Sequence, residues 1–137
     1  MKLEKDLYAR AADFLHPGGD SLAMLFEFQR IHQAELGELT LEPIEGVRRN
    51  ILRTIDELTE LLHCFDWKWH TERREEPADT QRIIEETADC LLFLTNVLIH
   101  AGVESGWELR DGIGVVCKKN IQRLESGRNV YQGKEQA

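Results

Sequence analysis

Apolar residues recur at three- and four-residue intervals along most of the chain, and turn-forming residues separate these stretches from one another. The pattern predicts five helical segments and contains no convincing alternation of apolar and polar residues that would predict a strand. We therefore predict an all-α fold, a four- to five-helix bundle. The length of 137 residues fits one globular domain, so residues 1–137 are expected to form a single domain, with 128–137 as a loose tail.

The first two predicted helices are short. The first covers about residues 3–14 and ends at the turn sequence HPGG at 16–19. The second begins near Asp20 and runs to Leu36, where a glycine follows as a helix stop.

A long amphipathic helix is predicted next. Pro43 suits its first turn, and an apolar stripe continues from Val47 to Trp69. A charged segment containing Pro77 separates it from a helix over residues 80–101. Apolar side chains point in nearly every direction around that helix, so we expect it to lie centrally in the core.

The last predicted helix begins at a capping box formed by Ser105 and Glu108. Its apolar stripe runs from Leu109 to Leu124 and is weakened by Gly112 and Gly114.

Two pairs of acidic residues lie next to apolar positions on the two central helices. Glu57 and Glu60 are one turn apart, and so are Glu86 and Asp89, which project about 60° apart. Antiparallel packing around the Pro77 segment would bring the pairs together. Four carboxylates in one cleft repel each other, and their hard oxygen atoms suit Mg²⁺, with Mn²⁺ as the alternative ion. We therefore predict a metal site.

A simpler interpretation of these acids is that they are solvated. In that case Arg53 would form an intrahelical ion pair with Glu57, and Arg82 would form one with Glu86, because each pair is four residues apart. Either acidic pair alone is common on helix surfaces, whereas the combination on two neighbouring helices is more specific.

Other polar residues interrupt apolar stripes. Gln29 lies among leucines on its helix with His32 one turn further on, and each could contact a ligand or be a buried group bonded inside the protein. Trp67 and Lys68 point to the side of the acids, where an indole can stack on a base and an ammonium can meet phosphate.

Further cations stand on the last helix. Asn120 faces its apolar side, flanked by Lys119 and Arg123, which can offer positive charge to a phosphate chain or remain solvated. His63 has no evident helper, and we assign it no role.

Composition narrows the classes of function. With 137 residues, 42% of them apolar, the chain can bury a core without disulfide bonds. Its 17 basic and 25 acidic residues give a net charge of -8, which disfavours nucleic-acid binding but allows phosphate-bearing small molecules held through divalent cations. The three cysteines are widely spaced, as in proteins with reduced thiols. The sequence has no apolar signal core and no 18-residue apolar run. We therefore predict a cytoplasmic protein that does not associate with membranes.

The spacing of the acids resembles a known family. The chain contains Glu57-x-x-Glu60, then 25 further residues, then Glu86-x-x-Asp89. This series resembles the acidic motifs of the all-α nucleoside triphosphate pyrophosphohydrolases, the MazG and dimeric dUTPase superfamily. The resemblance covers about residues 25–123. Within this superfamily, four segments look more like the dimeric dUTPase branch: LLHCFDWKWH, IIEETADCLLFLTNVLIHAG, MLFEFQRIHQ and KKN.

This resemblance implies roles for single residues. It implies that all four acids bind Mg²⁺ and that Glu57 or Glu60 also orients the attacking water. It further implies that Gln29 reaches toward the base, that Lys119 and Asn120 hold phosphate or sugar oxygens, and that the protein is a homodimer or tetramer. The chain departs from the branch one turn after the glutamine, where His32 and Gln33 replace the usual asparagine.

The predicted reaction is hydrolysis of a nucleoside triphosphate, with dUTP as the leading substrate, to the monophosphate and pyrophosphate. Three alternatives remain open. The first is a MazG-like hydrolase of other or non-standard nucleotides, and the second is a helical interaction module without catalysis. The third is a di-iron carboxylate protein, for which Glu60-x-x-His63 supplies one of the two required motifs.

Overall fold

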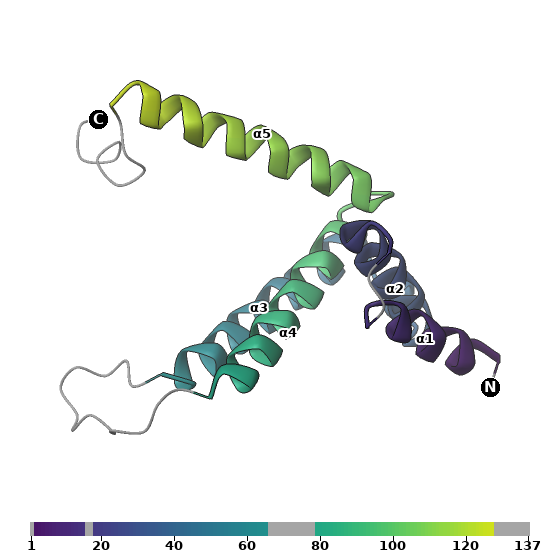
Figure 1. Cartoon of the computed structure of the whole chain (residues 1–137). Coiled ribbons are helices and arrows are strands. Elements are labelled where there is room, and N and C mark those ends of the chain that lie inside the picture. The colour runs from purple at the N-terminus through teal and green to yellow at the C-terminus, as the bar shows by residue number, and fades with distance from the viewer. Residues whose placement is uncertain (1, 16–17, 66–78, 128–137) are drawn as a thin grey trace.

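The computed structural model describes residues 2–15, 18–65 and 79–127 (Figure 1). These residues form five α-helices and one short 3-10 helix, and no strand occurs among them. The prediction of an all-α fold is therefore confirmed.

The N-terminal helices match their predicted positions. Helix α1 spans Lys2–Asp13 and helix α2 spans Ser21–Glu35. Asp20 caps α2, because its carboxylate accepts a hydrogen bond from the backbone N–H of Ala23 at 3.0 Å. After α2 the chain turns at Gly37 and forms the 3-10 helix η1, Glu38–Thr40, which the hydrophobic pattern does not predict.

The two central helices are equally long. Helix α3 spans Pro43–His63, with its proline in the first turn, and helix α4 spans Thr80–His100. The predicted continuation of α3 to Trp69 is wrong at Phe65, which follows the end of the helix, whereas Trp69 itself lies outside the described residues.

Helix α5 spans Gly106–Glu125, and its first turn differs from the predicted capping box. The Ser105 side chain makes no capping hydrogen bond, and Glu108 instead accepts one from the backbone N–H of Glu104 at 3.2 Å. The first residue of α5 must be small, because a Cβ atom at Gly106 would lie 2.6 Å from the carbonyl oxygen of Leu22 on α2.

Figure 1 shows an open arrangement of these helices. Helices α3 and α4 run side by side in antiparallel directions, and α2 packs against both α4 and α5, with α1 beside α2. Helices α4 and α5 diverge from the short connection between them, so the C-terminal half of α5 points away from the α3–α4 pair. Because α3 and α4 lie side by side along their length, side chains from both helices can meet in one site.

In most globular proteins apolar side chains are buried more often than polar ones, but within this single chain the opposite holds. Among the described residues, the buried apolar side chains are Phe26 and Cys90, whereas seven polar residues are buried. The expected central burial of α4 is wrong for this chain, since Leu91 and Leu94 are 51% and 49% exposed. The physical reason is that α2 and α3 cover only part of its circumference.

Helices α3 and α5 also leave apolar residues open. The exposed apolar residues of these two helices are Ile44, Ile51, Leu52, Ile55, Leu58, Leu62, Trp107, Ile113, Val115, Val116, Ile121 and Leu124. Within the described ranges, no helix is both long and apolar enough to cross a membrane.

Candidate metal centre

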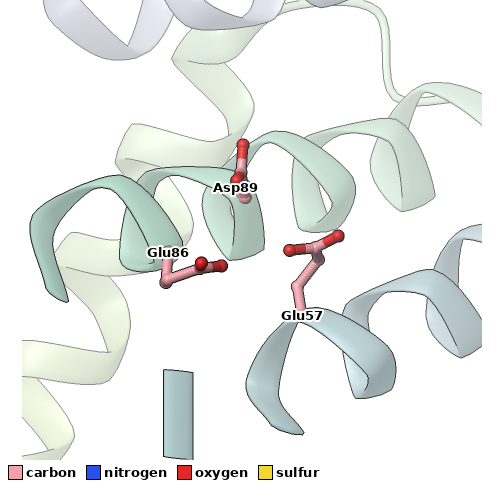
Figure 2. Close-up of side chains that lie close together, drawn as sticks. All are labelled: Glu57, Glu86 and Asp89. Atoms are coloured by element: carbon pink, nitrogen blue, oxygen red, sulfur yellow. The ribbon is translucent and has the colours of Figure 1, made fainter. Parts of the chain in front are cut away.

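Three of the four predicted acidic residues come together between α3 and α4. Figure 2 shows Glu57 on α3 facing Glu86 and Asp89 on α4. One carboxylate oxygen from each residue lies within 4.8 Å of the others, and all three side chains are partly buried. The predicted convergence across two helices is therefore present for these three residues.

Helix geometry explains why the three acids meet. Asp89 is the third residue after Glu86, so both project from one side of α4. On α3 the buried side is marked by Gly46, Asn50 and Thr54, and Glu57 continues that series at the next helical interval. These small and polar residues set the side of α3 that faces its neighbours, and the acid continues along it.

The electrostatic environment of Glu57 reflects this crowding. Partial burial is the largest cause that raises the pKa of Glu57, followed by the negative charges of Asp89 and Glu86. Glu60 and Asp56 add smaller contributions in the same direction. The Glu57 carboxyl therefore holds a proton more strongly than an ordinary glutamate does.

The same cluster acts on Cys90. This cysteine is buried, and burial raises the pKa of its thiol, with further contributions from Glu57, Asp89 and Glu86. A thiol in such surroundings stays protonated and is a poor nucleophile. Cys90 thus belongs to the packing of the site and not to its reactive groups.

The alternative ion pairs, Arg53 with Glu57 and Arg82 with Glu86, do not occur among the described residues. Arg53 lies 3.6 Å from Glu38 instead of pairing with Glu57. Within the described part of the chain, no lysine or arginine forms a salt bridge with Glu57, Glu86 or Asp89. No cation of the described residues thus offsets the mutual repulsion of the three carboxylates, and the oxygen donor set fits the preference of Mg²⁺ or Mn²⁺.

Glu60 stands at the edge of this cluster. It is exposed and does not belong to the group of three, although its charge still reaches Glu57. His63, the last residue of α3, is also exposed and lies outside the group. Both residues of the Glu60-x-x-His63 motif thus lie outside the group of three, and on α4 Asp89 stands where a second Glu-x-x-His motif would need a histidine.

Gln29 is buried on α2. Its Nε2 donates to Asn96 Oδ1 at 2.8 Å and approaches the carbonyl oxygen of Leu92 at 3.4 Å. The Gln29 Oε1 atom is also buried and accepts no hydrogen bond in the described structure. His32 stacks on Phe28, with ring centroids 6.0 Å apart.

The predicted phosphate-binding residues of α5 lie elsewhere in the single chain. Lys119 and Arg123 are exposed and Asn120 is partly buried, all on the half of α5 that points away from α3 and α4 (Figure 1). Trp67 and Lys68 lie outside the described residues. The structure thus does not bring Lys119, Asn120 or Arg123 to the acidic cluster of their own chain.

Sequence reasoning missed a set of buried polar residues near the site. Asn50 and Asn96 are hydrogen-bonded to each other at 3.1 Å, and His100 Nε2 pairs with Gln33 Oε1 at 3.0 Å. The available signal was spacing, because Asn50 precedes Glu57 by seven residues and Asn96 follows Asp89 by seven. Seven residues is about two helical turns, which places each asparagine on the same face as the nearby acid.

Known proteins provide no further guide to this site. Comparison of the chain with protein-family models, with curated proteins and with solved structures gives no match. The acidic cluster and the resemblance in the sequence are thus the two features that point to a function.

Proposed function

We propose that this protein is a nucleoside triphosphate pyrophosphohydrolase that requires Mg²⁺ or Mn²⁺. Its reaction converts a nucleoside triphosphate, with dUTP as the leading substrate, to the monophosphate and pyrophosphate. The observation that carries the proposal is the convergence of Glu57 with Glu86 and Asp89 from antiparallel helices. This is the arrangement that the acidic motifs of the resembled family would require.

The acidic residues divide into two roles in this proposal. Glu57, Glu86 and Asp89 hold the metal ion, which when bound neutralises phosphate charge and polarises the phosphate that is attacked. Glu60 is exposed beside them and can orient a water molecule and accept its proton. The resemblance in the sequence makes Glu57 a second candidate for the same task.

Cations for the phosphate chain have to come from another part of the structure. Lys119 and Arg123 lie on the half of α5 that points away from the cluster in their own chain. We therefore propose that α5 delivers them, together with Asn120, to the cluster of a neighbouring copy. Trp67 and Lys68 stay as predicted contacts to base and phosphate.

The apolar surface supports a homo-oligomer, either a dimer or a tetramer. Exposed apolar residues continue along α3 at Ile51, Ile55 and Leu58, and along α5 at Ile113 and Val116. Monomeric proteins rarely leave large contiguous apolar patches in water. Sedimentation of the purified protein tests this proposal, and a monomer at micromolar concentration would refute it.

The decisive experiment measures pyrophosphate release from a panel of deoxy- and ribonucleoside triphosphates with Mg²⁺. We expect equal amounts of monophosphate and pyrophosphate, and no activity in Glu86→Gln. Glu85→Gln is the matched control, because Glu85 is the adjacent exposed acid and lies outside the cluster. Equal activity of Glu86→Gln and the wild type would remove the proposed metal site.

The panel also separates the alternatives. Preference for a non-standard or purine nucleotide would favour a MazG-like hydrolase over a dUTPase. A helical interaction module predicts neither pyrophosphate release nor a Mg²⁺-dependent change in thermal stability. An iron-dependent visible absorption band would support the di-iron alternative.

A further inference from the structure

The side of α3 that faces α4 carries polar residues where a packed helix usually carries apolar ones. The buried residues of α3 are Gly46, Asn50 and Thr54, and none of them has a large apolar side chain. The apolar residues Ile51 and Ile55 of the same helix are exposed. Another kind of contact must therefore fix how far α3 is shifted along α4.

A pair of asparagine side chains provides such a contact. Asn96 Nδ2 on α4 donates to Asn50 Oδ1 on α3 at 3.1 Å, and the two residues are 1% and 0% exposed. We call Asn50 and Asn96 the amide pair. A hydrogen bond weakens steeply when its partners are displaced or misaligned, whereas apolar contact has no direction. The amide pair thus specifies one position of α3 along α4.

Both ends of the amide pair are anchored. Asn50 Nδ2 donates to the backbone carbonyl of Gly46 at 2.8 Å, which leaves Asn50 Oδ1 for Asn96. Asn96 Oδ1 accepts from Gln29 Nε2 on α2 at 2.8 Å, which leaves Asn96 Nδ2 for Asn50. Neither amide can turn over without losing both of its bonds. The amide pair is therefore held in one geometry.

The amide pair and the acidic cluster share one register of the antiparallel helices. Glu57 is seven residues further along α3 than Asn50, and Asp89 is seven residues before Asn96 on α4. Because the helices are antiparallel, both steps lead toward the same end of the α3–α4 pair, where the two acids meet.

The opposite ends of α3 and α4 keep the same register. Gly46 is four residues before Asn50, and His100 is four residues after Asn96. These two residues lie against each other, because a Cβ atom at Gly46 would overlap the His100 ring. Three contacts at equal steps along both helices thus agree, with the amide pair between the other two.

A shift of α3 along α4 would separate the acids. One helical turn measures about 5.4 Å, which exceeds the 4.8 Å within which the carboxylate oxygens of the cluster lie. Smaller shifts also matter, because Mg²⁺ demands near-octahedral oxygen ligands at about 2.0–2.1 Å. Ca²⁺ accepts a more flexible arrangement at about 2.3–2.6 Å. Loss of the register should therefore weaken Mg²⁺ binding more than Ca²⁺ binding.

We propose that Asn50 and Asn96 are positioning residues that hold the acidic cluster in the geometry for a divalent ion. The inference rests on the proposed metal site, from which the amide pair is about 10 Å, or two helical turns, away along the axis. Buried asparagines set the register of paired helices in coiled coils at a cost in stability. The amide pair has the same effect on α3 and α4, and so sets both the affinity and the selectivity of the site.

The test measures the affinity of the protein for Mg²⁺ and for Ca²⁺ by titration calorimetry, without nucleotide. The double variant Asn50→Leu with Asn96→Leu replaces both partners at once by apolar groups, and Gln29 Nε2 keeps the carbonyl of Leu92 at 3.4 Å. We expect its Mg²⁺ affinity to fall by about 10- to 100-fold, the range found when groups that orient metal ligands are removed. Its Ca²⁺ affinity should fall less. A role in stability alone would instead lower the midpoint of urea unfolding and leave the Mg²⁺ affinity of the folded protein unchanged.

The matched control is Thr54→Val. Thr54 is buried on the same side of α3, between Asn50 and Glu57, and its hydroxyl donates to the backbone carbonyl of Asn50 at 2.7 Å. The substitution removes a buried hydrogen bond within α3 and spares the contact between α3 and α4. It should keep the ratio of Mg²⁺ to Ca²⁺ affinity of the wild type. An unchanged Mg²⁺ affinity in the double variant, an equal loss for both ions, or the same loss in Thr54→Val would overturn the inference.

A measurement on the wild type covers variants that fail to fold. Coupling between two sites is reciprocal, so an ion that needs the register must in turn protect the amide pair. In ¹⁵N-labelled protein, Mg²⁺ should slow the exchange of the Asn96 side-chain NH₂ protons more than that of the backbone amide of Phe26, a buried residue of α2 that reports general stability. Equal slowing of both would overturn the inference.

These measurements separate the inference from the proposed hydrolysis. Mg²⁺ binding that depends on the amide pair, without pyrophosphate release from any nucleotide, would leave the inference standing and refute the hydrolysis. Pyrophosphate release with the same Mg²⁺ affinity in the double variant and the wild type would do the reverse. A wild type that binds neither ion would overturn both.

Discussion

Removing one charge from the acidic cluster should have opposite effects with and without a divalent ion. Glu57→Gln keeps the size of the side chain and removes a carboxylate whose oxygen lies within 4.8 Å of an oxygen of Glu86 and of Asp89. In the absence of metal this substitution relieves repulsion. In the presence of Mg²⁺ it removes a ligand of the proposed metal site.

The size of the repulsion can be worked from the geometry. Two unit charges 4.8 Å apart repel by about 3.5 kcal/mol at an effective dielectric constant of about 20 and by about 0.9 kcal/mol in bulk water. Glu57 is only partly buried, so solvent screening moves the value toward the lower figure. Because the substitution removes two such pairs, with Glu86 and with Asp89, we expect the metal-free variant to be more stable than the wild type by about 2 kcal/mol.

The assay is urea unfolding in a chelator and in excess Mg²⁺. A ligand at about 100 times its Kd stabilises a folded protein by about 2.7 kcal/mol, so Mg²⁺ should make the wild type the more stable of the two. The order of stability therefore reverses between the two buffers. Asp56→Asn is the control, since it removes the same charge from an exposed neighbour outside the cluster and should show no reversal.

The pH dependence of stability gives a second test of the proposed repulsion between Glu57 and its acidic neighbours. The pKa of Glu57 is raised in the folded state, so the folded protein takes up a proton at a higher pH than the unfolded chain does. The metal-free wild type should therefore gain stability as the pH falls through that raised pKa toward the ordinary value of 4.5, and its deficit relative to Glu57→Gln should vanish. A variant that is less stable than the wild type in the chelator would refute the proposed repulsion.

Three further predictions concern other residues. Burial lowers the pKa of His100, so the folded state resists its protonation; stability should fall as the pH drops below the ordinary value of 6.5, and His100→Gln should lose this part of the pH dependence in thermal unfolding. Gly46→Ala should destabilise the protein by about 1–3 kcal/mol in urea unfolding, because its Cβ would overlap the His100 ring, whereas Gly112→Ala has open space around it and should stabilise by about 0.5–1 kcal/mol. Iodoacetamide should modify the exposed Cys117 and spare the buried Cys90, whose thiol has a raised pKa; mass spectrometry of the labelled protein checks this, and equal labelling would contradict it.

Much of the helical organisation could be predicted from the sequence. Apolar periodicity located the helices, and the Asp20 cap placed the start of α2. The convergence of Glu57 with Glu86 and Asp89 followed from helical spacing and one assumption, that α3 and α4 are antiparallel. The 3-10 helix escaped prediction because three residues carry too little periodicity, and the capping box failed because Glu108 bonds to Glu104.

The hydrogen bonds that join the side-chain amides of Gln29, Asn50 and Asn96 could not be predicted for a different reason. An asparagine on a helix is usually exposed, and nothing local distinguishes Asn50 or Asn96 from a surface residue. Only the approach of α2, α3 and α4 turns Gln29 and the two asparagines into mutual partners. Long-range pairing of this kind belongs to the tertiary structure and not to any one segment.

The inverted burial of the central helices bears on the proposed oligomer. Periodicity shows that a face of a helix avoids water, but it does not say which surface covers that face. In α3 the stripe of Ile51, Ile55 and Leu58 stays open, while Asn50 and Thr54 face the interior of the same chain. Buried amides specify how α2, α3 and α4 align, whereas apolar contacts supply most of the free energy of association between helices. In such a chain, hydrogen bonds within one copy set the alignment of the helices. In our proposal, apolar contacts with another copy then supply the larger part of the stability. Its unfolding midpoint should then rise with protein concentration, in step with the population of the oligomer.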